Sequence, residues 1–137
     1  MPPLLVLMVD DNPGDRQLLA DAFTDCQMEA SFHGVSDYVQ AWIHLTGLLA
    51  TQADLPHVII IDLSLPTMPG EKIITALRGV EKLREIPLVV FAGMIRDDVA
   101  ERLTAVGVGR VVLKPKSYAE YLSFAHSLGD FNKPARL

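Results

Sequence analysis

The chain has 137 residues, half of them apolar, and its 17 acidic and 12 basic residues give a formal net charge of −5. This length and apolar content predict a single folded domain and exclude a largely disordered chain. The acidic balance argues against a nucleic-acid partner, because duplex binding depends on Lys and Arg side chains that neutralise phosphates.

The apolar runs of the sequence are too short for a membrane span of about 20 residues, so we expect no membrane partner. The N-terminal Met-Pro-Pro has neither the basic region nor the cleavage site of a signal peptide. Cys26 is the only cysteine, which rules out an internal disulfide and leaves a structural zinc site without partner ligands. Together these features predict a cytoplasmic protein.

Five short apolar runs, rich in Val, Ile and Leu, are spaced along the chain. They cover residues 4–9, a weaker stretch around 28–32, then 58–63, 88–92 and 111–113. Runs of this length and composition are typical of strands that are buried on both faces of a sheet. We therefore predict five strands at these positions.

Longer segments with apolar residues at helical spacing lie between and after these runs. Asn12 followed by Pro13 predicts a helix start, Ser36 precedes the second segment, and Ser117 with Glu120 has the spacing of a capping box. The apolar faces consist of Leu18, Leu19, Ala22 and Phe23; Ala41, Trp42 and Leu45; Ile73, Ile74, Leu77 and Val80; and Val99, Leu103 and Val106.

Strands that alternate with helices predict an α/β fold of the (βα)5 type, with a parallel sheet covered on both faces. We expect this domain to fill residues 1–129 and to be followed by a short tail, 130–137.

Charged residues follow three of the predicted strands. Asp10 and Asp11 come directly after the first, Asp62 lies near the end of the third, and Lys114 closes the fifth. The carboxyl ends of parallel strands share one edge of the sheet, so these side chains are expected to converge. The plainer reading is that the first two acids cap a helix and the third ends a strand, but a charge within Ile-Ile-Ile-Asp-Leu needs a stronger reason.

Converging carboxylates predict a cation, because two like charges about 4 Å apart repel by roughly 4 kcal/mol at an effective dielectric constant of 20. Mg²⁺ is the cation that best suits a site of carboxylates, a backbone carbonyl and water. The expected ligands are Asp10, Asp11, Asp62 and the backbone carbonyl of Ser64. A carboxylate beside such an ion and a lysine is able to attack phosphorus, so Asp62 is the candidate phospho-acceptor and Lys114 the phosphoryl contact.

The acidic pair Asp10-Asp11, the segment Asp62-Leu-Ser-Leu-Pro66-Thr-Met-Pro-Gly70 and the pair Lys114-Pro115 resemble the receiver domains of two-component response regulators. The resemblance covers nearly the whole chain. It implies a doubly wound, flavodoxin-like three-layer sandwich with strand order 2-1-3-4-5, and a cis peptide bond before Pro115. The segment that begins Asp10-Asp11-Asn12-Pro13-Gly14-Asp15 looks like the small single-domain regulators paired with phytochrome-type sensor kinases.

The resemblance also implies a function. A sensor histidine kinase would pass a phosphoryl group to Asp62, with Mg²⁺ held by Asp11 and, partly through water, by Asp10. The domain would then act as a phospho-acceptor that at most dephosphorylates itself, so we do not expect an enzyme. An acid-phosphatase-like hydrolase would need a second Asp where Ser64 stands, and a flavin binder would not place an acidic first turn beside a phosphate.

Two positions depart from the family. Ala92 stands where receivers usually carry Thr or Ser, and Val111 stands where they carry an aromatic residue. We therefore expect Asp62 to accept phosphate without the usual coupling between that hydroxyl and that aromatic ring. The alternative is an atypical receiver that serves as a protein-interaction scaffold and is never phosphorylated.

The last predicted helix carries two apolar stripes. One consists of Tyr118, Leu122 and Ala125, and the other of Tyr121, Phe124 and Leu128. One stripe should pack on the sheet. The second either extends a wide apolar face around the core or forms the interface of a homodimer, since exposed apolar patches mark interaction sites.

Overall fold

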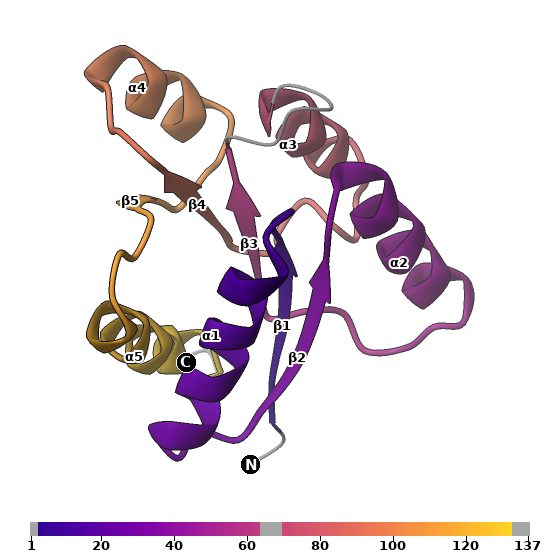
Figure 1. The fold of residues 1–137 in the computed structure, drawn as a ribbon. Coiled ribbons are helices and arrows are strands. Elements are labelled where there is room, and N and C mark those ends of the chain that lie inside the picture. Colours follow the sequence, from indigo (N-terminus) through magenta and orange to yellow (C-terminus); the bar gives the residue numbers. More distant parts are fainter. Residues whose placement is uncertain (1–2, 64–69, 133–137) are drawn as a thin grey trace.

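The structure is a computed structural model, and it describes residues 3–63 and 70–132. The described residues form one parallel sheet of five strands in the order β2-β1-β3-β4-β5, with helices on both faces (Figure 1). This confirms the predicted fold class and strand order. The elements are β1 (Leu4–Val9), α1 (Pro13–Asp25), β2 (Ala30–Val35), α2 (Tyr38–Ala50), β3 (Val58–Asp62), α3 (Gly70–Arg78), β4 (Leu88–Ala92), α4 (Asp97–Ala105), β5 (Arg110–Leu113), α5 (Tyr118–Ser127) and the 3-10 helix η1 (Leu128–Asn132).

The strands match the apolar runs best in the middle of the sheet. All five residues of β3 and all five of β4 are buried, as expected for strands covered on both faces. The edge strand β2 differs: it runs from Ala30 to Val35, not over 28–32, and most of its side chains are partly or fully exposed. Its pairing with β1, from Leu4 opposite Ala30 to Val9 opposite Val35, fixes this register.

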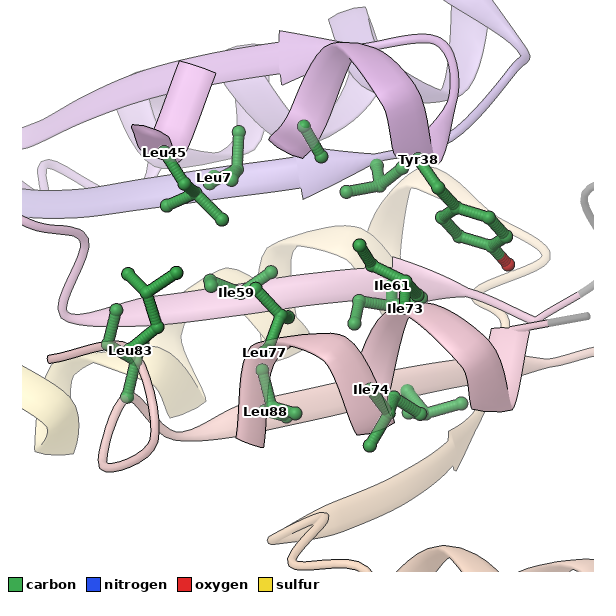
Figure 2. Packing of buried hydrophobic residues seen from close by; sticks show 14 of the residues in the cluster. Leu7, Tyr38, Leu45, Ile59, Ile61, Ile73, Ile74, Leu77, Leu83 and Leu88 are labelled. Atoms are coloured by element: carbon green, nitrogen blue, oxygen red, sulfur yellow. The ribbon is translucent and has the colours of Figure 1, made fainter. Parts of the chain in front are cut away.

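Alternate side chains of each strand enter two separate cores. Ile59 and Ile61 of β3 join the core under α2 and α3, whereas Val58 and Ile60 join the core under α1 and α5. Figure 2 shows the first core, where Leu45 of α2 and Leu77 of α3 lie against the sheet. Burying a side chain of this size contributes about 1.5–3 kcal/mol, so the two cores hold the strand ends in place.

The helix starts follow the predicted capping chemistry. The side-chain oxygen of Asn12 accepts hydrogen bonds from the backbone N–H groups of Gly14 (2.8 Å) and Asp15 (3.2 Å), with Pro13 as the first helical residue. Ser117 caps α5 and accepts from the N–H of Glu120 at 3.2 Å. The second helix is capped by Asp37, one residue after the Ser36 that marked its start in the sequence.

Helices α3 and α4 bury less of their predicted faces than the spacing suggested. Ile73, Ile74 and Leu77 are buried in α3, while Val80 lies beyond the end of that helix and is partly buried. In α4 only Leu103 is buried, and Val106 is 40% exposed. Val106 is the C-cap residue, where the backbone leaves the helical conformation, so it no longer follows the apolar face.

Helix α5 corrects the expected dimer surface. Tyr121 is 2% exposed and Leu128 is fully buried, both within the core shared with α1. Phe124 is partly buried and its ring packs on Phe91 of β4, with the ring centroids 4.8 Å apart. The interface predicted from these three residues is therefore wrong, because the stripe completes the core of its own chain. Dimerisation itself stays a prediction, with no surface assigned to it.

The C-terminal part of the described chain continues to pack on the domain. Helix η1 crosses the boundary predicted at residue 129, and the guanidinium carbon of Arg110 lies 4.9 Å from the centroid of the Phe131 ring. The division into a domain and a tail stays a prediction. No helix within residues 3–63 and 70–132 has the length and apolar character that crossing a bilayer requires.

Candidate functional site

Three carboxylates meet at the carboxyl edge of the sheet. Asp10 directly follows β1, Asp11 comes next, and Asp62 is the last residue of the neighbouring strand β3. One ligand oxygen of each lies within 4.8 Å of the others. Asp10 is fully buried and Asp62 is 2% exposed, whereas Asp11 is open to solvent. The structure thus brings together residues that are 52 positions apart in sequence.

Lys114 enters the same site from the end of β5. Its backbone N–H donates to the carbonyl of Ala92 at 2.9 Å, which extends the β4–β5 pairing by one residue. Its ammonium nitrogen lies 3.0 Å from Asp62 Oδ2 and 2.9 Å from Asp10 Oδ2. Burial lowers the pKa of Lys114, but its contacts with the carboxylates outweigh that effect and raise the pKa above its usual value. Lys114 is therefore a permanent positive charge.

A fourth carboxylate, that of Asp15, also reaches the site, and the sequence did not predict it there. Asp15, in the first turn of α1, places its Oδ2 2.9 Å from the Lys114 nitrogen. A negative charge in the first turn of a helix is favourable in itself, so the position of Asp15 in the sequence gives no sign of a contact with a residue 99 positions later. With all groups ionised, the three clustered carboxylates, Asp15 and Lys114 give the site a formal charge of −3.

Keeping Asp10 ionised at this buried position has an electrostatic cost. Burial raises the pKa of Asp10 above its usual value, more than the contact with Lys114 and the hydrogen bond from the Asn12 N–H lower it. The Asn12 N–H donates to Asp10 Oδ1 at 2.9 Å, and Arg16 donates to the Asp10 carbonyl at 2.6 Å. Backbone and side chain are thus fixed, and the carboxylate cannot turn away from its acidic neighbours.

Tyr38 is the second residue that the sequence did not place at the site. It begins α2, it is 2% exposed, and its hydroxyl donates to the backbone carbonyl of Asp62 at 2.8 Å. Burial, together with the charge of Asp62, raises the pKa of Tyr38, so the hydroxyl remains a hydrogen-bond donor. Figure 2 shows this ring at the edge of the core. An apolar spacing that reads as core gives no signal for this bond.

Gly70, in the segment that follows Asp62, lies close to two other side chains. A Cβ atom at this position would lie 2.6 Å from Leu63 Cδ1 and 3.0 Å from the Tyr38 hydroxyl oxygen. Both distances are shorter than ordinary packing, so a side chain at residue 70 would require Leu63 and the Tyr38 hydroxyl to shift, and glycine suits this close approach of α3 to the end of β3. The predicted ligand Ser64 and the motif residue Pro66 lie outside the described residues.

Ala92 and Val111, the two positions that the resemblance marks as atypical, lie on the paired strands β4 and β5. Ala92 is the last residue of β4 and is 5% exposed, and Val111 lies in β5 and packs partly against the core. The described residues contain no cis peptide bond, so the expectation for Pro115 is wrong and its peptide bond is trans. The trans form is the lower-energy state before proline by about 0.5–1 kcal/mol.

The donor set fits a hard divalent cation. The cluster offers only carboxylate oxygens, it contains two buried acids, and it keeps a negative charge after Lys114 is counted. Such oxygen ligands suit Mg²⁺, and the exposed side of Asp11 leaves access to water, which Mg²⁺ retains. The residues therefore fit the ion that the sequence predicted.

A protein-family model described as the response regulator receiver domain matches residues 6–124. Among curated proteins, the probable methanogenesis regulatory protein FilR2 of Methanothrix harundinacea is 27% identical over 118 residues, which are 86% of this chain and 76% of that protein. Other curated relatives are longer, and the chain spans between 7% and 48% of their length.

Solved structures show the same fold. The phosphorylated cyanobacterial phytochrome response regulator RcpA superposes with a TM-score of 0.81 at 22% identity, covering 94% of this chain and 93% of RcpA. The bacteriophytochrome response regulator AtBRR superposes with a TM-score of 0.74 at 26% identity, covering 100% of this chain and 99% of AtBRR. Several of the similar structures are thus regulators associated with phytochromes.

Proposed function

Because the chain belongs to the response regulator receiver domain family, a family of signalling domains, we propose that it accepts a phosphoryl group on Asp62 in a two-component pathway. The observation that carries this proposal is the position of one carboxylate. Asp62 is buried, its Oδ2 lies 3.0 Å from the Lys114 ammonium, and the acidic pair Asp10 and Asp11 lies beside it. A carboxylate so placed is both desolvated and beside a fixed positive charge.

The proposed reaction is a phosphoryl transfer to oxygen. A carboxylate oxygen of Asp62 forms a bond to phosphorus, the phosphorus–nitrogen bond of a phosphohistidine donor breaks, and the imidazole keeps the electron pair and takes up a proton. Lys114 stays at hydrogen-bond distance and stabilises the phosphoryl oxygens. Asp10 and Asp11, with the Asp62 carboxylate and the Ser64 carbonyl, would hold Mg²⁺, which supplies charge stabilisation for the transferring group.

The donor we propose is a sensor histidine kinase, and a phytochrome-type kinase is the specific candidate. Support comes from AtBRR, at 26% identity, whose name describes a bacteriophytochrome response regulator. The matching Asp10–Asp15 segment supports the same assignment. A kinase of this kind would meet its regulator in the cytoplasm, which is where we place this protein.

Acetyl phosphate tests the acceptor directly. We expect the protein incubated with Mg²⁺ and acetyl phosphate to gain the mass of one phosphoryl group, and the gain to disappear in Asp62→Asn and in EDTA. Asp54→Asn is the matched control, because Asp54 is an exposed acid in the loop before β3 and should leave the gain intact. A phosphoryl group that remains in Asp62→Asn would overturn the assignment of the acceptor.

Ala92 and Val111 bear on how a phosphoryl group at Asp62 would change the rest of the domain. Neither side chain is able to hydrogen-bond a phosphoryl group, and such a bond to a charged group contributes roughly 1.5–3 kcal/mol to a two-state switch. We propose that phosphorylation occurs and leaves β4 largely unmoved. Hydrogen exchange of residues 88–92 with and without BeF₃⁻ and Mg²⁺ tests this, and a large change in protection there would contradict it. No mass gain with acetyl phosphate or with a kinase would favour the scaffold.

A further inference from the structure

Asp15 contacts the site without belonging to the acidic cluster. Its backbone N–H is held by the Asn12 cap at 3.2 Å, and its carboxylate reaches Lys114 at 2.9 Å while the side chain stays 25% exposed. Within the described residues, the carboxylates that converge on a common point are those of Asp10, Asp11 and Asp62, so Asp15 is not one of the candidate metal ligands. Its contact at the site is with Lys114.

Lys114 is in close contact with three carboxylates once Asp15 is counted. An ammonium group carries three N–H donors. Three carboxylates, those of Asp10, Asp15 and Asp62, lie 2.9, 2.9 and 3.0 Å from the nitrogen. With three carboxylate oxygens this close to the nitrogen, an incoming phosphoryl oxygen competes with one of these contacts. Asp10 is fully buried and is fixed by Asn12 and Arg16. Asp15 is partly exposed, so its carboxylate is the one that is able to leave Lys114 and be solvated by water instead.

We propose that Asp15 is a positioning residue that competes with the phosphoryl group for Lys114 and so limits how fast Asp62 is phosphorylated. This inference rests on the proposed function and adds a regulation of the same site. The contact holds the lysine in place at rest, and it must loosen before the lysine is able to serve the phosphoryl oxygens.

The negative charge of Asp15 should slow the phosphorylation of Asp62, as its contact with Lys114 does. Because the Asp15 and Asp62 oxygens both lie within 3.0 Å of one nitrogen, they are at most about 6 Å apart, inside the roughly 8 Å over which salt at physiological strength screens charges. Phosphorylation increases the negative charge on residue 62, and the Asp15 carboxylate opposes that increase. The same carboxylate favours a nearby cation, so its removal should affect phosphate and Mg²⁺ in opposite directions.

The test compares Asp15→Asn with the wild type in acetyl phosphate and saturating Mg²⁺. We expect kcat/KM for phosphorylation to rise roughly tenfold, because charge-assisted contacts are worth about this factor, with a lower KM for acetyl phosphate. The advantage should shrink in high salt, and Mg²⁺ should bind more weakly. Asp15→Glu, which restores the charge, should return the rate toward the wild-type value.

Asp21→Asn is the matched control. Asp21 lies on the same helix and loses the same charge, but it is exposed and its carboxylate accepts from Gln17 at 2.8 Å, away from Lys114. A rate in Asp15→Asn that equals that of Asp21→Asn, or falls below it, overturns the inference while the proposed function stands. Phosphorylation of Asp15→Asn but not of the wild type would support it strongly. Absence of phosphorylation in both proteins would overturn the inference and the proposed function together.

Discussion

Replacing Asp10 by Asn should make the metal-free protein more stable. Asp10 is fully buried, and burial raises its pKa, so the ionised side chain destabilises the folded state. The Asn side chain has the same shape and keeps an oxygen that accepts from the Asn12 N–H, now at 2.9 Å. Lys114 keeps Asp15 and Asp62 as partners, so the substitution leaves no buried charge alone.

The size of the effect follows from three contributions. At 4.8 Å, the upper limit of the distance between the Asp10 and Asp62 ligand oxygens, two charges repel by about 3.5 kcal/mol at an effective dielectric constant of 20. At the 2.9 Å contact, Lys114 attracts Asp10 by about 6 kcal/mol on the same scale. Desolvation of a buried carboxylate costs several kcal/mol. The balance predicts that Asp10→Asn raises the free energy of unfolding by roughly 1–2 kcal/mol, or about 4–8 °C in Tm.

Urea or thermal unfolding in EDTA measures this difference. In the folded protein burial raises the pKa of Asp10 above its ordinary value of 3.8. Its ionisation therefore lowers stability as the pH rises through the raised pKa, and the advantage of Asp10→Asn should grow over that range and be absent well below 3.8.

Mg²⁺ provides the second arm of the same experiment. Mg²⁺ at ten times its Kd should stabilise the wild type by about 1.4 kcal/mol, and most of that gain should be lost in the variant. An Asp10→Asn protein that is less stable than the wild type in EDTA would refute the electrostatic reasoning.

Substitutions at three further residues test contacts of the site and of the core. Tyr38→Phe removes the hydroxyl bonded to the Asp62 carbonyl and should lower the free energy of unfolding by about 1–2 kcal/mol in urea denaturation; an unchanged midpoint would show that the bond is not needed. Leu128→Ala should cost about 2–5 kcal/mol, because Leu128 is fully buried; a variant that keeps its stability but changes its sedimentation would instead support an interface. Asn12→Ala should cost about 1 kcal/mol and Asn12→Ser less, since Ser also caps helices; equal losses would argue against the cap.

The central strands and the edge at which the charges meet were predictable because each rests on a local signal. The buried run of β3 ends at the charged residue Asp62, and parallel pairing then places Asp10, Asp62 and Lys114 at one edge whatever their separation in sequence. The predicted bounds of edge strand β2 were wrong because its apolar run is interrupted. Its observed bounds depend on pairing with β1.

The contacts of Asp15 and Tyr38 were not predictable from local patterns. Each residue has a sufficient local explanation, as a charge in the first turn of a helix and as part of an apolar face. Their contacts with Lys114 and with the Asp62 carbonyl depend on how two elements pack in space. The stripe on α5 failed for a related reason: spacing shows that Tyr121 and Leu128 share a face, but only packing against α1 shows that this face is internal.

A crystal structure of the protein with Mg²⁺ and BeF₃⁻, a mimic of the phosphoryl group, tests the central claim most directly. We predict beryllium bonded to a carboxylate oxygen of Asp62, a fluorine within hydrogen-bond distance of the Lys114 ammonium, and the cation between Asp11 and Asp62. An Asp62 carboxylate left without beryllium under conditions that saturate Mg²⁺, or beryllium bound to a different acid, would contradict the assignment of this cluster as a phospho-acceptor site.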